Sequence, residues 1–436
     1  MVKSLNDTSL STTQKYQRYV NTSFVDNVEP IVLTGGQGAV VTDVAGHDYV
    51  DCFAGIAVTN AGHSNKAVLE AAAEQMRHLV HCCSYVYHVP VVADLAELLA
   101  SVTPGDLSKT FFGNSGAEAI EGAMRLAKVY TGRSEFVSLQ QSFHGRTAGT
   151  LSVTGNAKRK TRGTPYVSGT AFGPCPYCYR CPLRARYPQC DLACADYIDL
   201  VFRYETAGDV AAFIAEPVLG EGGIIPPPPG YFERIREVLE GYKALFIADE
   251  VQTGFGRTGK LFGIQHFDIV PDIMCMAKGI ANGFPLGAFI ARPEIADAFR
   301  PGEHLSTFGG NPVSCAAAVA NIRYLQEQRL PEQAAEKGEW LTAQLMRLME
   351  RHPLIGDVRG KGLMVGVELV TGRDSKEPAS AAAKAVRAFC REHGVLVGVG
   401  GSLGNVVRFQ PPLVITYDQL EQAVSAFGGA LAATAP

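Results

Sequence analysis

The sequence has no apolar run that approaches the roughly 20 residues needed to span a membrane, so we expect no membrane partner. It also lacks a large charge of either sign, because 39 Lys and Arg residues face 43 Asp and Glu residues. The net charge of −4 gives no electrostatic case for binding nucleic acid or an acidic membrane surface. Residues 1–20 are polar and contain no apolar signal-peptide core, so we expect a cytoplasmic protein.

The composition is that of an ordinary globular protein. The 436 residues are 47% hydrophobic and 19% charged, which allows a large core in a chain too long for one small domain. The sequence contains no internal repeat and no long linker. Many of its 46 glycines lie where a loop meets a helix or strand, as in enzymes built from α/β units.

Between residues 65 and 324 the pattern alternates between helix and strand. Helical periodicity predicts helices at 67–78, 91–100, 115–130 and 231–242. Short apolar runs predict strands at 109–113, 135–139, 210–216 and 244–249, within 269–277, and at 286–291. Strands that alternate with helices imply a mostly parallel sheet covered on both faces.

The two ends of the chain have a different pattern. The C-terminal part predicts helices at 331–349, 380–393 and 417–431, a strand pair within 355–370, and strands at 395–399 and 406–410. Three N-terminal strands, at 31–33, 39–43 and 49–51, have no helical partner nearby and should join this C-terminal layer. The sequence therefore predicts an α/β fold with a large domain at 65–330 and a small α+β domain made from 1–64 and 331–436.

Lys278 is the first candidate catalytic residue. It lies among apolar and small residues at 276–287, where a lysine is unusual because burial must desolvate its ammonium group. Desolvation lowers the pKa of a lysine, and the neutral amine can form a Schiff base with an aldehyde. The alternative is a lysine that extends from a loop to solvent. The apolar strand upstream, which ends at Asp249 and is followed by Gln252, favours the catalytic interpretation.

Residues 113–118 predict a phosphate site between a strand and a helix. The small residues Ser115, Gly116 and Ala117 let backbone N–H groups approach an anion, and the helix N-terminus adds a favourable dipole. The segment lacks the Lys-Ser/Thr of a P-loop and the three-glycine dinucleotide fingerprint. The alternative is an ordinary helix start at which Ser115 is only the N-cap.

Two further strand exits offer groups for a flat, cationic ring. Phe143 and His144 follow the strand at 135–139, and such side chains can stack on a ring, although a core aromatic is the more common outcome. Asp249 ends an apolar strand, where α/β sheets bind their ligands. A carboxylate at that depth needs a cationic partner such as a protonated pyridine nitrogen. The alternative for Asp249 is a cap on the following turn.

These segments together match pyridoxal phosphate, which has one phosphate, one flat ring, one pyridine nitrogen and one aldehyde. The chain also resembles the class III, ω-amino-acid type of pyridoxal-phosphate-dependent aminotransferases, of fold type I, and within that family it looks most like the 4-aminobutyrate aminotransferases. The stretch at 248–259 is the most specific part of the resemblance. The motifs that carry it span almost the whole chain and lie at 53–63, 113–118, 143–146, 215–223, 248–259, 277–279, 306–312 and 359–363.

The resemblance implies roles for residues at matching positions. Lys278 would carry the cofactor as a Schiff base and move a proton between substrate and cofactor. Asp249 would pair with the pyridinium nitrogen, and Gln252 would bond the ring oxygen. The remaining residues that would bind the cofactor are Ser115, Gly116 and Ala117 at the phosphate, Phe143 on the ring, His144, Glu216 and Thr307. Thr307 would reach the phosphate of the neighbouring subunit, so the resemblance implies a homodimer with shared active sites, or a tetramer built from it.

The resemblance also implies how substrates bind. Arg408 matches the arginine that binds the carboxylate of the acceptor in a bidentate fork, and Glu221 matches the glutamate that pairs with this arginine when no carboxylate is present. The alternative for Glu221 and Arg408 is a surface salt bridge worth ~0–1 kcal/mol. Arg146 and Ile56 match residues that accommodate a donor with a remote carboxylate, although ornithine enzymes also have an arginine at the first position.

We therefore expect an enzyme that moves an amino group from a 4-aminobutyrate-like amino acid or amine to 2-oxoglutarate or pyruvate. An aminotransferase that uses an amine or alanine with pyruvate or glyoxylate is an alternative, although Ile56 is not aromatic, which weakens the amine:pyruvate interpretation. A racemase or epimerase on the same scaffold would also need Lys278. A non-catalytic, metal-dependent interaction protein is the third possibility, and the intact Lys278 and Asp249 argue against it.

A cysteine-rich insertion at 174–195 departs from the family. Eleven cysteines is a high count, and five of them fall in this stretch at Cys175, Cys178, Cys181, Cys190 and Cys194. The Cys-x₂-Cys-x₂-Cys spacing can ligate zinc or an iron–sulfur cluster, although the stretch contains no histidine. Disulfides within the loop and plain thiols in a packed insertion are the other two interpretations, and reduced thiols are the default in the cytoplasm.

Overall fold

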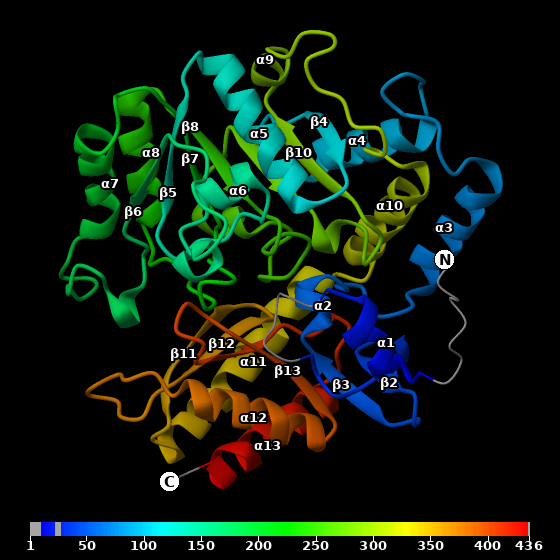
Figure 1. The fold of residues 1–436 in the computed structure, drawn as a ribbon, viewed down its shortest axis with the longest axis vertical. Helices are drawn as coiled ribbons and strands as arrows, with labels where there is room; N and C mark the ends of the chain where they lie inside the picture. Colours follow the sequence, from blue (N-terminus) through cyan, green and yellow to red (C-terminus); the bar gives the residue numbers. More distant parts are fainter. Residues whose placement is uncertain (1–9, 22–27, 435–436) are drawn as a thin grey trace, which may run out of the picture.

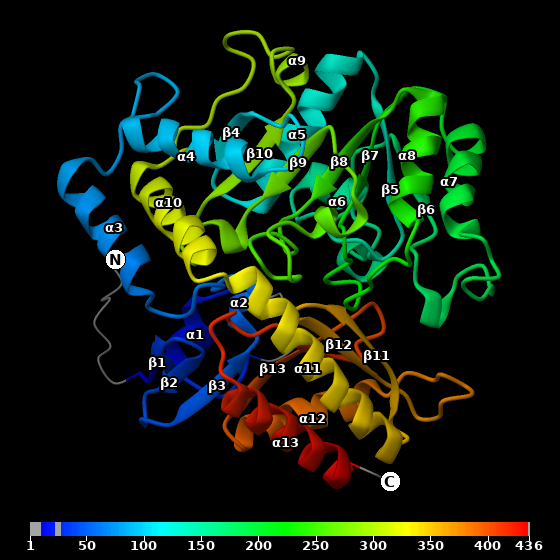
Figure 2. The same ribbon diagram turned by 180° about the vertical axis from the view of Figure 1, so that it is seen from behind.

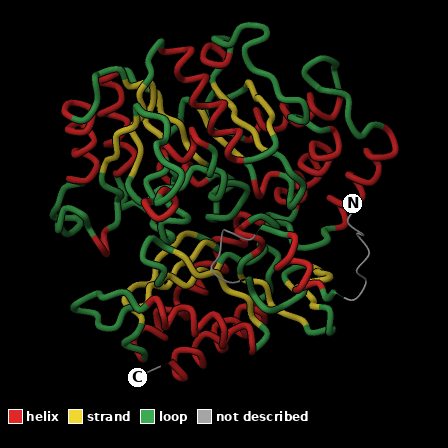
Figure 3. The backbone as a smooth tube through the Cα atoms, in the orientation of Figure 1, coloured by secondary structure: helices red, strands yellow, loops and turns green. Residues whose placement is uncertain are grey.

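The computed structural model describes residues 10–21 and 28–434, which form two lobes. Figure 1 shows a large domain, mainly light blue, cyan and green, above a small domain that combines dark blue N-terminal with yellow, orange and red C-terminal segments. In Figure 3 each lobe contains its own group of strands. No helix of these described residues is long and apolar enough to cross a membrane. The parts of the predicted small domain at 1–9, 22–27 and 435–436 lie outside the described residues.

The large domain is built on a seven-stranded sheet with the order β4-β10-β9-β8-β7-β5-β6. Only β10 runs antiparallel to its neighbours β9 and β4, and the other pairings are parallel, as the alternating pattern predicts. The strands are β4 (Lys109–Gly113), β5 (Glu135–Leu139), β6 (Thr170–Gly173), β7 (Val210–Ala215), β8 (Leu245–Asp249), β9 (Ile273–Met276) and β10 (Gly287–Ala291).

Helices cover both faces of this sheet, as Figures 1 and 2 show from opposite sides. Along β7, Phe213 packs into one hydrophobic cluster and Ile214 into the other, so alternate side chains fill two cores and the strand is buried throughout. The helices of this domain are α3 (Lys66–His78), α4 (Pro90–Val102), α5 (Gly116–Thr131), α6 (Ala148–Val153), α7 (Ala193–Tyr204), α8 (Tyr231–Tyr242), α9 (Pro293–Ala296) and α10 (Pro312–Glu327).

The small domain has a second seven-stranded sheet, in which the two ends of the chain meet. Strand β3 pairs in parallel with β13, with Val50 opposite Val395, so the N-terminal strands do join the C-terminal layer. The strands are, in sheet order, β1 (Leu33–Gln37), β2 (Val40–Asp43), β3 (Asp48–Cys52), β13 (Val395–Gly400), β14 (Val406–Phe409), β12 (Met364–Leu369) and β11 (Ile355–Lys361). The helices are α1 (Thr12–Tyr19), α2 (Ala54–Ala57), α11 (Leu330–Arg351), α12 (Ser380–Glu392) and α13 (Tyr417–Thr434).

The predicted elements differ from the observed ones at a few places. The expected strand at 31–33 is wrong in position, because β1 begins at Leu33 and runs through Gly35 and Gly36 to pair with β2. Gly36 fits there because an added Cβ would lie 3.1 Å from the side chain of His63. Strand β6 and helix α10 were not predicted, because β6 has only four residues and α10 contains a run of small residues, and neither gives a clear hydrophobic period.

The cysteine-rich insertion follows β6 and packs against the small domain. All eleven cysteines are free, so the disulfide interpretation is wrong. No group of three or more His, Cys, Asp or Glu side chains among the described residues could hold a metal ion, which removes the support for the metal interpretation. Tyr177 and Arg180 both contact the buried carboxylate of Glu368 on β12, and Lys376 Nζ donates to the carbonyl of Tyr179 at 2.7 Å. The stretch is a packed insertion whose cysteines line a cavity of about 10 Å³.

Candidate active site

Lys278 follows β9 at the carboxyl end of that strand, and it is the first residue of the 3₁₀ turn Lys278–Ile280. Its φ of 47° is in the left-handed region, which a non-glycine residue occupies at a cost in strain. Burial lowers the pKa of its ammonium group, while the carboxylates of Glu221, Asp249 and Glu216 act in the opposite direction. Burial therefore makes the ammonium group of Lys278 easier to deprotonate than that of an exposed lysine, while the three carboxylates favour its charged form.

Asp249 is buried at the end of β8, with 3% of its surface exposed. Its Oδ1 accepts the N–H of Val251 at 3.0 Å, so it does cap the following turn, while Oδ2 lies 2.7 Å from Nδ1 of His144. His144 is itself buried, and its Nε2 lies 3.4 Å from the hydroxyl of Ser138. Nδ1 of His144 therefore holds the buried carboxylate of Asp249 and fixes its orientation, and the stacking of His144 on a flat ring stays a prediction.

Glu216 connects two loops of the site. Its carboxylate accepts the N–H of Phe143 at 2.9 Å and the N–H of Gly220 at 2.7 Å. Burial raises the pKa of Glu216 to about 7, with Asp249 adding to the rise and His144 opposing it. Glu216 thus positions the loop of Phe143 and the loop that leads to Glu221, and we expect it to act through these loops.

The helix cap and the predicted phosphate cradle coincide at the start of α5. Ser115 is the N-cap, and its hydroxyl accepts the N–H of Glu118 at 3.2 Å. Gly116 and Ala117 are the first two residues of the helix, so their N–H groups have no acceptor within the helix. An added Cβ at Gly116 would lie 2.8 Å from the side chain of Val251, next to the Asp249 turn. The cradle is therefore packed directly against the strand end that carries the buried carboxylate.

Gly287 supports the cradle from the opposite side and was missed by the sequence reasoning. It begins β10, and an added Cβ would lie 2.2 Å from the carbonyl oxygen of Ser115. We expect Gly287→Ala to displace the cradle and to weaken binding of a phosphate-bearing cofactor on the order of tenfold, because overpacking costs about 1–3 kcal/mol. A titration of the apoprotein with pyridoxal phosphate measures this affinity.

A matched control is available for that substitution. Gly241, in α8, has nothing within 4 Å of an added Cβ, and alanine is a better helix former than glycine. Gly241→Ala should therefore leave the affinity unchanged. Equal affinities for the Gly287→Ala and Gly241→Ala proteins would show that the contact with Ser115 does not shape the cradle.

Gln252 and Gln410 form a buried amide pair between the two domains. Gln252 Oε1 accepts a hydrogen bond from Gln410 Nε2 at 2.9 Å, which leaves the amide N–H groups of Gln252 as donors for a ligand. The Oε1 of Gln410 is buried without a partner among the described residues. Sequence reasoning missed Gln410, although strand alternation places it two residues after Arg408, on the same face.

Glu221 and Arg408 are buried together, so the surface salt-bridge interpretation is wrong. Arg408 NH1 on β14 lies 3.0 Å from Glu221 Oε1, and the two residues are 3% and 7% exposed. Burial alone would raise the pKa of Glu221, but Arg408 and a second arginine, Arg159, outweigh it and hold that pKa at about 2. Arg159 NH2 lies 3.2 Å from Glu221 Oε2. Arg159 was not identified from the sequence, where it stands in a basic run that reads as solvated surface.

Ile56 lies in a short left-handed turn at the domain junction. Residues 54–57 all have φ between 51° and 70°, which is costly for alanine and isoleucine. Asp51 holds this turn, because its Oδ1 accepts the N–H groups of Phe53 at 2.8 Å and of Ala54 at 2.9 Å. The ring of Phe53 in turn lies 5.7 Å from the guanidinium carbon of Arg408. Ile56 thus lies three residues after Phe53, in a strained, hydrogen-bonded segment.

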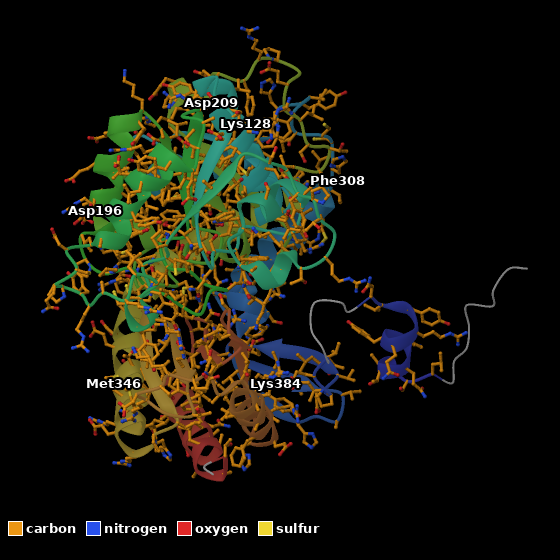
Figure 4. All side chains as sticks on the ribbon, turned by 60° about the vertical axis from the view of Figure 1, so that its left-hand side comes forward. Lys128, Asp196, Asp209, Phe308, Met346 and Lys384 are labelled. Atoms are coloured by element: carbon orange, nitrogen blue, oxygen red, sulfur yellow. The ribbon has the colours of Figure 1, made fainter. Side chains whose placement is uncertain are left out.

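The side chains of Arg146 and Thr307 are exposed, and neither makes a hydrogen bond or ion pair with another described residue. Thr307 lies beside Phe308, whose side chain is 60% exposed and is labelled on the right-hand face in Figure 4. Hydrogen bonds and ion pairs therefore connect His144 with Asp249, Glu216 with Phe143, and Glu221 with Arg408, whereas such contacts among the described residues do not fix the side chains of Arg146 and Thr307.

Comparison with known proteins places this geometry in one family. A family model described as aminotransferase class-III matches residues 23–431. An acetylornithine aminotransferase of Methanosarcina mazei is 44% identical over 91% of this chain and 90% of its own length. A leucine/methionine racemase of Thermococcus litoralis is 38% identical over 96% and 94%. A probable 4-aminobutyrate aminotransferase of Bacillus subtilis is 36% identical over 94% and 95%.

The fold agrees with solved structures over nearly the whole chain. An amine transaminase from an uncultivated Pseudomonas species, solved in the PLP-bound (internal aldimine) form, superposes with a TM-score of 0.90 at 34% identity. The superposition covers 94% of this chain and 98% of that one. The likeness therefore extends over both lobes and over the site between them.

Proposed function

This chain belongs to the class III aminotransferases, which depend on pyridoxal phosphate, and we propose that within this family it uses a 4-aminobutyrate-like donor and a 2-oxo acid acceptor such as 2-oxoglutarate or pyruvate. The observation that carries the proposal is the buried ion pair between Glu221 and Arg408. Transamination alternates two substrates in one site, and this pair can hide or present a positive charge as the substrates change.

The residues of the site suit pyridoxal phosphate. The buried carboxylate of Asp249 needs a cation, and the pyridinium nitrogen supplies one. Gly116 and Ala117 offer helix N-terminal N–H groups to the phosphate, and Phe143 offers a half-buried ring. When bound, the cofactor supplies an electron sink for charge that develops on the substrate carbon.

We assign the proton transfer to Lys278. Its lowered pKa leaves a larger neutral fraction than that of an exposed lysine, so Nζ can take a proton from the carbon that bears the substrate amine. Asp249, held by His144 and by the N–H of Val251, would direct its carboxylate at the ring nitrogen. Gln252, fixed by Gln410, would present its amide N–H groups to the ring oxygen of the bound cofactor.

The ion pair between Glu221 and Arg408 allows one site to bind the amino donor and the 2-oxo acid in turn. With a donor that has no carboxylate beside its amine, the pair stays closed and Arg408 is neutralised. With a 2-oxo acid, Glu221 moves away and Arg408 binds the carboxylate through two parallel N–H groups. The Nε of Arg408 is buried without a partner among the described residues, so one donor for such a fork is already available.

A donor with a remote carboxylate accords with the relatives. The Bacillus relative is named for 4-aminobutyrate and the Methanosarcina relative for acetylornithine, and both compounds carry a carboxylate far from the reacting amine. We propose that Arg146, whose guanidinium is exposed and unpaired among the described side chains, binds that distant carboxylate, with Ile56 on the other side of the substrate.

We also propose a homodimer with shared active sites. Val86, Tyr87, Leu305 and Phe308 form an exposed apolar patch, and the ring of His81 lies 5.1 Å from that of Phe308, which joins its two segments. Helix α1 buries none of its residues and stands away from the rest of the protomer in Figure 4. A second copy would cover both, and Thr307 within the patch would then reach the phosphate of the neighbouring site.

A panel of donors tests the substrate proposal. We expect the enzyme to use 4-aminobutyrate with 2-oxoglutarate. Arg146→Ala should lower kcat/KM for 4-aminobutyrate, because it removes charge-assisted hydrogen bonding worth about 1.5–3 kcal/mol. Donors in the panel should include ornithine, β-alanine, alanine and 1-phenylethylamine, and acceptors should include pyruvate and glyoxylate. If the Arg146→Ala protein still preferred 4-aminobutyrate over 1-phenylethylamine as strongly as the unsubstituted enzyme does, the role of Arg146 would be refuted.

The racemase relative motivates one further arm of the panel. L-Leucine incubated with the holoenzyme and no oxo acid should remain L-leucine. Accumulation of the D-enantiomer would favour the racemase alternative over transamination.

A further inference from the structure

We propose that Arg159 is a positioning residue that receives Glu221 when this glutamate leaves Arg408, and that it thereby sets how readily the site accepts a substrate carboxylate. The inference rests on the proposed function, in which Arg408 binds that carboxylate. It gives Glu221 a second ion-pair partner, so that its carboxylate has two defined positions, one at Arg408 and one at Arg159.

The two oxygens of Glu221 are divided between two arginines. Oε1 lies 3.0 Å from NH1 of Arg408, and Oε2 lies 3.2 Å from NH2 of Arg159. Arg408 is almost fully buried, whereas 30% of the side chain of Arg159 is exposed. Glu221 therefore bridges a buried arginine and one that reaches solvent.

The three residues come from both domains. Arg408 belongs to β14 of the small domain, whereas Glu221 lies in the loop after β7 and Arg159 in the 3₁₀ turn Ala157–Lys160, both in the large domain. The guanidinium of Arg159 lies 6.0 Å from the centroid of the Phe143 ring, which places it over the loop that Glu216 also holds. Arg159 can thus retain Glu221 on the side of the large domain.

Opening the pair with Arg408 would be costly if Glu221 had no second cation beside it. The two arginines keep the carboxylate ionised at neutral pH, so opening the pair moves a full negative charge. Leaving such a charge buried and unpaired costs several kcal/mol, which would be subtracted from the binding energy of the incoming carboxylate. Because Arg159 already contacts Oε2, Glu221 can release Arg408 by a side-chain rotation and keep one ion pair throughout.

The backbone beyond Glu221 is held in place, which limits the movement to the side chain. Arg359 donates from NH2 to the carbonyl of Gly223 at 2.7 Å and from Nε to the carbonyl of Ile224 at 2.9 Å. Gly220, just before Glu221, donates to Glu216. The glutamate is therefore carried on a loop that is fixed at both ends.

The experiment measures binding as well as turnover. We would compare the holoenzyme with Arg159→Gln, Glu221→Gln, the double variant and Arg408→Gln, using calorimetric titration with glutarate, a dicarboxylate that cannot react. Lys158→Gln is the matched control, because it removes the same charge from the adjacent residue, for which no contact with Glu221 exists among the described side chains. Melting temperatures confirm that each variant is folded.

We expect Arg159→Gln to weaken glutarate binding on the order of tenfold, and Lys158→Gln to change it less than about twofold. In the Glu221→Gln background, where Arg408 has no glutamate to release, Arg159→Gln should have almost no further effect. Steady-state kinetics should show the loss as a higher KM for 2-oxoglutarate relative to that for 1-phenylethylamine, and Arg159→Lys should restore part of it.

Other outcomes overturn the inference in distinct ways. An equal loss in both Glu221 backgrounds would mean that Arg159 contacts the carboxylate itself, and an equal loss in Lys158→Gln would mean that only the local charge matters. Unchanged binding in Arg159→Gln with weakened binding in Arg408→Gln would remove the role of Arg159 and leave the proposed function intact. Unchanged binding in Arg408→Gln would remove both.

Discussion

Replacing Lys278 with alanine should abolish transamination and remove the visible absorption band of the covalently bound cofactor. The amine of Lys278 is the only group that we assign both to attach the cofactor and to move the proton, and its pKa is already lowered by burial for that task. Loss of a positioned general base alone lowers kcat about 10²–10⁴-fold, and loss of the attachment adds to this. Absorption spectra and initial rates of the purified protein measure the two effects separately.

Lys260 provides the control for this substitution. It is an exposed lysine whose Nζ donates to the carbonyl of Gln265 at 2.7 Å, far from any proposed catalytic role. Lys260→Ala should keep both the absorption band and the turnover. Full turnover in Lys278→Ala would contradict the assignment of the site, whatever the spectrum shows.

Asp249→Asn should lower kcat by about 100- to 4000-fold while the protein remains folded. Asparagine keeps the shape of the side chain and an oxygen for the N–H of Val251, but it loses the charge that pairs with the ring nitrogen. Breaking a buried ion pair by neutralising one partner costs about 3–5 kcal/mol, and each 1.4 kcal/mol is a factor of ten. Rates at saturating cofactor separate this loss from weaker cofactor binding.

The adjacent carboxylate of Glu250 tests whether the effect is specific. Glu250 is fully buried and accepts the N–H groups of Gly263 at 2.9 Å and Ile264 at 2.7 Å, so it holds a turn. Burial raises the pKa of Glu250 to about 7, so its charge is partly absent at neutral pH. Glu250→Gln should lower stability more than it lowers kcat. Equal losses of kcat in the two variants would mean that burial, and not the charge of Asp249, matters.

The periodic parts of the fold could be predicted from the sequence. Strands β4, β5 and β8 and helix α8 are short apolar or amphipathic segments between clear breaks, and the structure confirms them within about a residue. The joining of the chain ends was also predictable, because strands at 39–43 and 49–51 had no local partner. The pairing of β3 with β13 that satisfies them spans more than 300 residues, and no local pattern gives its register.

The candidate site divides in the same way. Asp249 ends one apolar strand and Lys278 follows another, and strand ends are where such sheets place ligands. Local sequence pattern and side-chain chemistry were therefore sufficient to select these two residues as candidates. Arg159 and Gly287 could not be found in this manner. Arg159 matters only because Glu221, 62 residues later, lies against it, and Gly287 matters only because Ser115 approaches from another strand. Their roles depend on long-range contacts that periodicity does not encode.

The most direct test of the central claim is a pair of single half-reactions. The purified holoenzyme is mixed with 4-aminobutyrate and no oxo acid, then separated from small molecules and mixed with 2-oxoglutarate. The account predicts one equivalent of the aldehyde product in the first step and one equivalent of glutamate in the second, with the starting absorption spectrum restored. Exchange of the substrate hydrogen with solvent and no stored amino group after the first step would contradict it.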